Sequence, residues 1–142
     1  MIVLDTNVIS ELMRAEPDLM VMEWFTQQPI AGLFTTTITE AEIYYGLELL
    51  PDGRRREAFQ AAARAMFEED FGGRILAFDS DAAHAYADIA SARRLGGQPI
   101  SQFDAQIAGI VRSRGARLST RNLRDFVNCK IELVDPWAVG AP

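Results

Sequence analysis

In Met1-Ile2-Val3-Leu4-Asp5-Thr6-Asn7, a carboxylate directly follows a short apolar run. Such a run predicts a strand that is buried on both faces of a parallel sheet. Open parallel sheets form their binding sites beyond the carboxyl ends of their strands. The sequence therefore places Asp5 at the edge of the sheet where a site would form.

The composition is typical of one folded domain. The chain has 142 residues, of which 49% are hydrophobic, so a sizeable core is expected and disorder is not. No apolar stretch is long enough to cross a bilayer, and no signal peptide is recognised. A single cysteine, Cys129, cannot form an internal disulfide. We therefore expect one domain over residues 1–142, located in the cytoplasm and not in a membrane.

The charge is acidic overall, but the cations are unevenly distributed. A net charge of −6 argues against a general nucleic-acid coat, although not against a nuclease whose own acids contribute to that charge. The seven arginines from position 93 to position 124 form either a solvated face or a rim that binds phosphates bidentately. They are Arg93, Arg94, Arg112, Arg114, Arg117, Arg121 and Arg124.

Short apolar runs alternate with longer helical patterns, which is typical of a parallel sheet built from βα units. We expect an α/β fold of three layers, with about five parallel strands flanked by helices. The expected strands are 2–4, 33–36, 74–78, 117–119 and 131–134. Helices are expected after Asn7, which can cap the first of them, after Pro17-Asp18, from the second strand to Leu50, over about 55–69, from Asp79-Ser80 to Gly96-Gly97, and from Ser101 to about Arg114. In the helix after Pro17-Asp18, the apolar residues Leu19, Met22 and Phe25 fall on one side.

A second acid, Glu42, borders the apolar stripe of its helix. The sequence also offers a local explanation, because Thr39-x-x-Glu42 and Thr37-x-x-Glu40 both match a capping box. Only one of them can be the true cap. If Thr37 is the cap, Glu42 lies inside the helix and is free for another role.

A third acid, Asp104, falls on the apolar stripe that continues through Ile107, Ala108 and Val111. A carboxylate buried there without a partner would cost several kcal/mol or become protonated. Ser101-x-x-Asp104 also places it in the first turn of a helix, where the helix dipole favours an acid. Both interpretations can hold together.

Asp5, Glu42 and Asp104 thus lie on three separate elements near buried faces, although Asp5 alone could be a turn residue. Hard cations such as Mg²⁺ and Mn²⁺ prefer oxygen ligands, whereas one histidine and one cysteine make a zinc site improbable. The segment Ser119-Thr120-Arg121-Asn122-Leu123-Arg124-Asp125 follows a strand and can reach the same edge. Its alternative interpretation is an ordinary Asx or Ser/Thr turn.

Taken in order, these segments resemble a PIN domain and, within that superfamily, a VapC-type toxin of a type II toxin–antitoxin system. The resemblance covers essentially the whole chain. It rests on Ile2–Val8, Thr39–Leu47, Phe103–Ala108, Ser119–Asn122, Asp125-Phe126 and Asp135-Pro136-Trp137.

The resemblance implies a ribonuclease that hydrolyses RNA phosphodiesters with Mg²⁺ or Mn²⁺ held by Asp5, Glu42 and Asp104. It implies that Thr6 and Thr120 orient water or phosphate. Asn122 stands where some members carry a fourth acid, and Asp125 is a substitute for it. The family further implies an antitoxin that covers the site and a homodimer. Trp24, Tyr44 and Tyr45 are candidates for such interfaces or for the core.

Four other classes compete with this interpretation. A PIN-like module could bind RNA or a partner without cutting. A phosphoacceptor receiver domain would need paired acids after the first strand, where only Asp5 occurs, with Asp79 and Lys130 as rough matches for its other groups. A haloacid-dehalogenase-like phosphatase would need an aspartate in place of Asn7. A dinucleotide-binding fold would need a glycine-rich turn there.

Overall fold

The computed structural model describes residues 1–138 and contains five parallel strands in the order β3-β2-β1-β4-β5. The strands are β1 (Ile2–Leu4), β2 (Leu33–Thr36), β3 (Ile75–Leu76), β4 (Arg117–Ser119) and β5 (Glu132–Val134). This confirms the expected α/β class, although the third strand is shorter than residues 74–78. The order also differs from the 2-1-3-4-5 order of receiver domains, which excludes that alternative.

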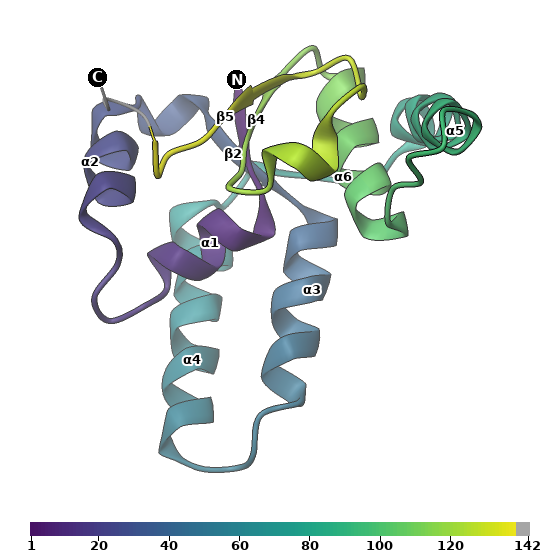
Figure 1. Cartoon of the computed structure of the whole chain (residues 1–142). Helices are drawn as coiled ribbons and strands as arrows, with labels where there is room; N and C mark the ends of the chain where they lie inside the picture. Colours follow the sequence, from purple (N-terminus) through teal and green to yellow (C-terminus); the bar gives the residue numbers. More distant parts are fainter. Residues whose placement is uncertain (139–142) are drawn as a thin grey trace.

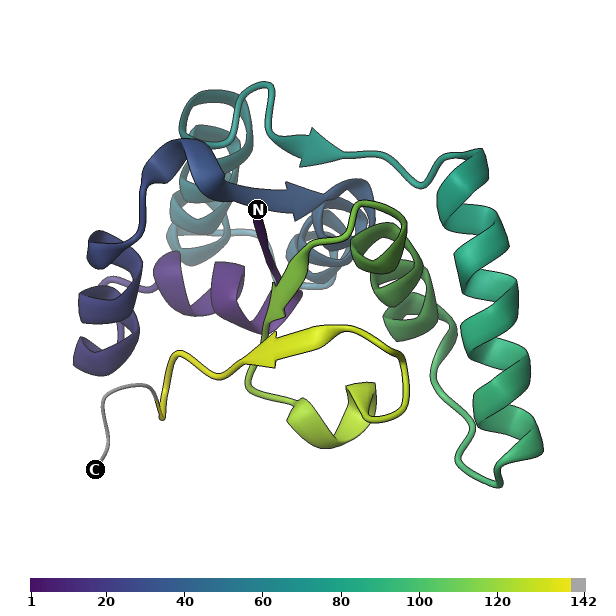
Figure 2. The same cartoon turned by 90° about the horizontal axis from the view of Figure 1, so that it is seen from above.

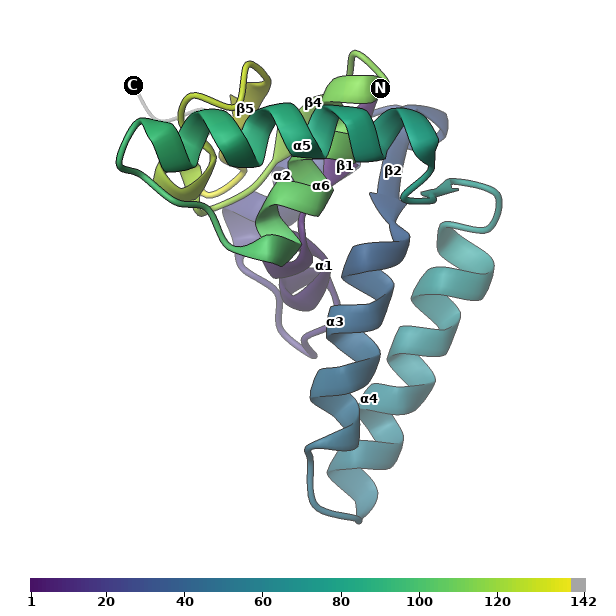
Figure 3. The same cartoon turned by 90° about the vertical axis from the view of Figure 1, so that its right-hand side faces the viewer.

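Helices cover both faces of the sheet (Figures 1 and 2). α5 and α6 lie on one side, and α3 and α4 run side by side and project away from the sheet (Figure 3). The helices are α1 (Thr6–Leu12), α2 (Leu19–Gln27), α3 (Thr37–Glu48), α4 (Arg54–Arg64), α5 (Ser80–Leu95) and α6 (Gln102–Ser113). Shorter helical segments are η1 (Ile30–Gly32), the π-helical η2 (Ala65–Asp70) and η3 (Leu123–Phe126).

Successive residues of β1 enter two separate cores. Ile2 and Leu4 pack with residues of α1, α3 and α4, whereas Val3 packs with residues of α5 and α6. All three are buried, as expected for a central parallel strand. The end of this strand is consequently held from both sides, which fixes the position of the residue that follows it.

Several local predictions were wrong. Asp5, rather than Asn7, is the N-cap of α1, and Thr36, rather than Thr37 or Thr39, caps α3. The buried residues of α2 are Val21 and Trp24, whereas Leu19 is exposed; of the two roles considered for Trp24, the structure shows the core.

Within residues 1–138, no helix is both long enough and apolar enough to cross a membrane. The expected domain extended to residue 142, and its last four residues lie outside the described part of the chain.

Candidate active site

Asp5 sits where β1 ends and α1 begins. Its backbone N–H donates to the carbonyl of Ser119 at 2.9 Å, which continues the pairing of β1 with β4. Its side chain is only 3% exposed and accepts hydrogen bonds from the Thr6 backbone N–H at 2.8 Å and the Thr120 hydroxyl at 2.7 Å. Burial raises the pKa of Asp5 from 3.8 to about 6, despite these hydrogen bonds.

Glu42 lies in the second turn of α3 and faces α1. Its Oε1 accepts a hydrogen bond from the Thr6 hydroxyl at 2.9 Å, and that hydroxyl also lies 3.0 Å from the hydroxyl of Thr39. Partial burial raises the pKa of Glu42, and the negative charge of Asp104 raises it further. Thr36 is the cap of α3, so Glu42 takes no part in capping that helix. Glu42 is therefore free for another role, which was one of the two interpretations of the sequence.

Asp104 lies in the first turn of α6, and its backbone N–H donates to the hydroxyl of Ser101 at 3.2 Å. Burial raises the pKa of Asp104, and the nearby charge of Asp125 raises it further. Asp104 therefore lies in the first turn of its helix and also faces inward, so both interpretations of its position hold.

The three acids lie close enough for their charges to act on Asp5 and Glu42. The charges of Asp104 and Glu42 both raise the pKa of Asp5. No basic side chain of residues 1–138 is among the groups that lower the pKa of Asp5 or Glu42. Clustered carboxylates without a cation favour the binding of a hard divalent ion, so the donor set fits Mg²⁺ or Mn²⁺.

The acids do not surround a common point. Within the described chain, no three His, Cys, Asp or Glu side chains stand together as a ready cage for an ion. Each of two carboxylates is instead held by a threonine hydroxyl, Asp5 by Thr120 and Glu42 by Thr6. Binding one ion by all three acids would therefore require their side chains to move from these positions.

Thr120 links the carboxyl end of β4 to Asp5. Its fully buried hydroxyl donates to Asp5 and accepts from the Asn7 amide at 3.2 Å and from the Asn122 backbone N–H at 3.0 Å. The side chains of Asn122 and Asp125 are exposed at the rim of the site. Asp125 is close enough to Asp104 to raise the pKa of Asp104, so both residues lie at the predicted edge.

Asn7 was missed as a site residue because it was interpreted as a helix cap. Since α1 begins at Thr6, the Asn7 side chain is free to bind across the site. Its amide nitrogen lies 3.3 Å from Asp5 Oδ2, and its amide oxygen accepts from the Arg121 backbone N–H at 3.2 Å. Its place two residues after Asp5 was a weak signal, because its partners Thr120 and Arg121 lie far away in the sequence.

Arg93 belongs neither to a solvated face nor to a phosphate rim, which corrects both interpretations for this residue. Its side chain is buried and donates to the carbonyls of Gln98 at 2.6 Å, Asp125 at 2.8 Å and Val127 at 2.9 Å. It therefore fixes the loop that carries Asp125. Sequence reasoning missed this role because its partners are backbone carbonyls.

Two other arginines of this set have local partners. Arg121 stacks over the ring of Trp137 at 5.0 Å, and Arg114 lies 3.5 Å from Asp79. Arg117 begins β4 and thus lies at the end of the strand opposite to Thr120. A continuous phosphate rim is not formed by these residues.

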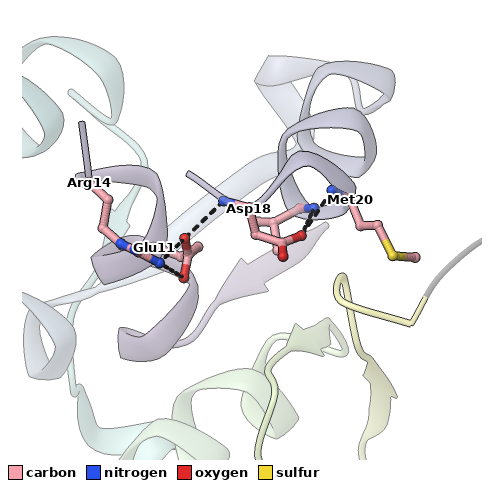
Figure 4. Close-up of polar contacts among 5 residues, drawn as sticks. Glu11, Arg14, Asp18 and Met20 are labelled. Atoms are coloured by element: carbon pink, nitrogen blue, oxygen red, sulfur yellow. Dashed lines mark hydrogen bonds and ion pairs between the residues drawn. The ribbon is translucent and has the colours of Figure 1, made fainter. Parts of the chain in front are cut away.

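Glu11 shows how the same fold treats a buried acid outside the site (Figure 4). It is 8% exposed, pairs with Arg14 at 3.0 Å and accepts from the Asp18 backbone N–H at 2.9 Å. Asp18 in turn caps α2 through the backbone N–H of Met20. Glu11 is thus neutralised and ties α1 to α2, whereas the three acids of the site have no comparable ion pair within residues 1–138.

Glu42 also separates two hollows in the surface. The first, of about 320 Å³, is largely apolar and is lined by residues of α1, α3 and α4 and of the turns that follow α1 and α3, among them Met13, Leu47 and Leu50. The second, of about 670 Å³, is lined by Ala41, Glu42, Tyr45 and Phe103. Glu42 is therefore the acid that both hollows share.

A parallel α/β domain with acids grouped at the carboxyl edge of its sheet defines a PIN-like class of protein. Comparison with known proteins agrees, since the family model described as "PIN domain" matches residues 2–129. The chain belongs to the PIN domain family.

Three similar proteins illustrate this relationship. The chain is 39% identical to VapC ribonuclease Y4jK of Sinorhizobium fredii over 96% of its own length and 98% of that protein. It is 32% identical to toxin FitB of Neisseria gonorrhoeae, covering 96% of this chain and 99% of FitB. The crystal structure of FitAcB from Neisseria gonorrhoeae superposes with a TM-score of 0.85 at 31% identity, over 96% of this chain and 99% of that one.

Proposed function

We propose that this protein is a metal-dependent endoribonuclease that hydrolyses RNA phosphodiester bonds and acts as the toxin of a toxin–antitoxin pair. The names of its relatives, VapC ribonuclease and toxin FitB, support the class of activity. The observation that carries the proposal is the grouping of Asp5, Glu42 and Asp104, three partly or fully buried acids from separate elements, in which Asp104 raises the pKa values of both Asp5 and Glu42.

In this proposal Asp5, Glu42 and Asp104 hold Mg²⁺ or Mn²⁺. Such an ion supplies Lewis acidity and activates water for attack on phosphorus. Thr120 and Asn7 keep Asp5 oriented through their hydrogen bonds, and Thr6 does the same for Glu42. Asn122 and Asp125 act at the rim, where they orient water or substrate.

We also propose an antitoxin partner and a homodimer. The antitoxin is supported by solved relatives that are themselves complexes, such as the DNA-bound VapBC of Salmonella typhimurium. The largely apolar hollow beside α1 leads to Glu42, so a partner segment lying there would cover the acids. A homodimer rests on the family resemblance, and the burial of Trp24 removes that residue from the candidates for its interface.

The last part of the proposal concerns organisation and location. We propose that residues 1–142 form one domain and that it acts in the cytoplasm, where its proposed RNA substrate is found. The buried, unpaired Cys129 is consistent with a reducing compartment.

The test is RNA cleavage by the chain purified free of its partner. We expect cleavage with Mg²⁺ or Mn²⁺, no cleavage with EDTA, and a loss of at least about 100-fold in Asp5→Asn and Asp104→Asn. Asp88→Asn, an exposed acid of α5, is the matched control and should cleave normally.

Unchanged cleavage in both site variants would refute the assigned roles. If the folded wild type bound the ion, seen as a rise in its melting temperature, yet cut no RNA, a catalytically silent PIN-like binding module would be the better description.

A further inference from the structure

The hollow between α3 and α6 carries two exposed aromatic rings beside the acids. Tyr45 is 66% exposed and Phe103 is 52% exposed, and both line this hollow together with Ala41 and Glu42. The two helices are neighbours on the carboxyl side of the sheet (Figure 3). Large exposed aromatic side chains at one hollow indicate a binding surface more often than an unused one.

Each ring lies next to one of the acids in the chain. Tyr45 follows Glu42 by three residues on α3 and so lies one turn further along the same side of the helix. Phe103 immediately precedes Asp104 in the first turn of α6. Anything held between these rings would therefore lie beside the acids of the site.

The neighbouring tyrosine shows that exposure is not general on α3. Tyr44 packs against Phe67, with ring centroids 5.5 Å apart, and thus contributes to the packing of α3 against η2. No comparable aromatic contact is found for Tyr45 or Phe103 within residues 1–138. Their faces remain available to a ligand.

The lining of the hollow indicates which part of a nucleic acid would fit. No basic side chain lines it, and Glu42 contributes negative charge, so it is unsuited to a phosphate. Aromatic faces stack well on bases, which are uncharged and flat. A volume of about 670 Å³ leaves ample space for one base.

We propose that this hollow holds an unpaired base of the RNA next to the bond that is cut, stacked on Tyr45 and Phe103. The inference rests on the proposed ribonuclease function and adds a requirement for single-stranded substrate, because a base within a duplex cannot enter. A protein segment suits the other hollow better, since that one has the aliphatic lining of Met13, Leu47 and Leu50.

The experiment compares Tyr45→Leu and Phe103→Leu with wild type on a short single-stranded RNA. Leucine keeps the apolar character and removes the ring. Loss of one stacking contact should raise KM about 5- to 100-fold while kcat changes by less than about twofold. Tyr45→Phe should restore KM, and Leu49→Ala, at the exposed C-cap of α3 and outside the lining of the hollow, should leave it unchanged.

A spectroscopic readout tests stacking directly. RNA carrying 2-aminopurine at successive positions is bound to the Asp104→Asn variant, which should not cleave it. Quenching of one probe is expected, and it should be lost when Tyr45→Leu or Phe103→Leu is added.

The outcomes separate the two proposals. Cleavage by wild type with unchanged KM and quenching in the leucine variants overturns the stacking site alone. If wild type cuts no RNA, the proposed function fails, and the quenching experiment still decides whether the hollow binds a base. If the leucine variants convert a dimer into a monomer in sedimentation without changing quenching, the surface is an interface between copies and the inference is wrong.

Discussion

At the scale of single residues, the environment of Asp5 differs from that of an ordinary buried acid. Glu11 is nearly as buried, but Arg14 neutralises it. Asp5 instead faces two other carboxylates and relies on hydrogen-bond donors that are not charged. The metal-free fold is therefore strained electrostatically at this point.

We expect the metal-free protein to become less stable as Asp5 ionises. The folded-state pKa of about 6 lies above the ordinary value of 3.8, so the folded chain holds this proton more tightly than the unfolded chain. The destabilisation is absent below about pH 4, grows through about pH 6, and reaches about 3 kcal/mol.

The measurement is urea unfolding in EDTA, with Asp5→Asn as the variant that cannot ionise. Between pH 4 and pH 7 the difference in unfolding free energy should shift in favour of the variant by about 3 kcal/mol. Adding Mn²⁺ to wild type at pH 7 should offset the loss. A difference that does not vary with pH would contradict the prediction.

Thr120 should matter through its hydroxyl alone. Thr120→Val keeps the shape but removes the 2.7 Å hydrogen bond to Asp5 and the acceptor for Asn7. We expect Mn²⁺ affinity and kcat to fall about 10- to 100-fold, the usual effect of removing a group that orients a ligand. Thr120→Ser should retain most activity. Isothermal titration with Mn²⁺ and cleavage assays measure both, and a fully active valine variant would refute this role.

The three acids could be predicted because each is a charged residue at a position that the apolar pattern marks as inward. Asn7 and Arg93 could not be placed in the same way. Their roles depend on partners far away in the sequence, Thr120 for Asn7 and the carbonyls of 125 and 127 for Arg93. Spacing along one element carries no information about such contacts.

At the scale of elements, the positions of strands and helices were predictable, but their ends were less so. Asp5 directly follows β1 and Thr36 is the last residue of β2, and each also caps the helix that follows. A single residue thus makes the transition from strand to helix in both places. The inward side predicted for α2 was wrong at the start of the helix. Leu19 directly follows the Asp18 cap and is 84% exposed. Apolar residues at a helix start need not face the core.

The packing of α5 on α6 depends on a glycine. A Cβ at Gly109 would lie 2.7 Å from the carbonyl oxygen of Ala82 and 3.0 Å from the backbone N of Tyr86. Because both neighbours are backbone atoms, the two helices would have to separate. The close approach also holds α6 in place, and with it Asp104 in the first turn of that helix.

Gly109→Ala should therefore destabilise the protein by about 1–3 kcal/mol. Gly46→Ala is the matched control, since a Cβ there meets no described atom within 4 Å. It should be neutral or stabilise α3 by up to about 1 kcal/mol. Urea unfolding of both variants tests the pair, and equal effects would contradict the close approach.

At the scale of the whole molecule, the apolar hollow beside α1 should govern inhibition rather than chemistry. Met13→Ala and Leu50→Ala remove apolar contacts from its lining and leave the three acids in place. We expect them to weaken inhibition by the cognate partner about tenfold or more, with RNA cleavage by the free chain unchanged.

Leu95→Ala, an exposed leucine at the end of α5, serves as the control for that experiment. Titration of cleavage activity with the purified partner is the measurement. Equal inhibition of all variants would show that the partner binds elsewhere.

The strand order has a consequence for how the molecule opens. β1 is bonded to a strand on each side, whereas β3 and β5 are edges with one neighbour each. Backbone amides of Ile2–Leu4 should therefore exchange with deuterium only when the whole domain unfolds, while the edges exchange through local opening. Asp5 is attached to the most persistent strand, so the outer strands can fray or rearrange without releasing the carboxylate on which the proposed chemistry depends.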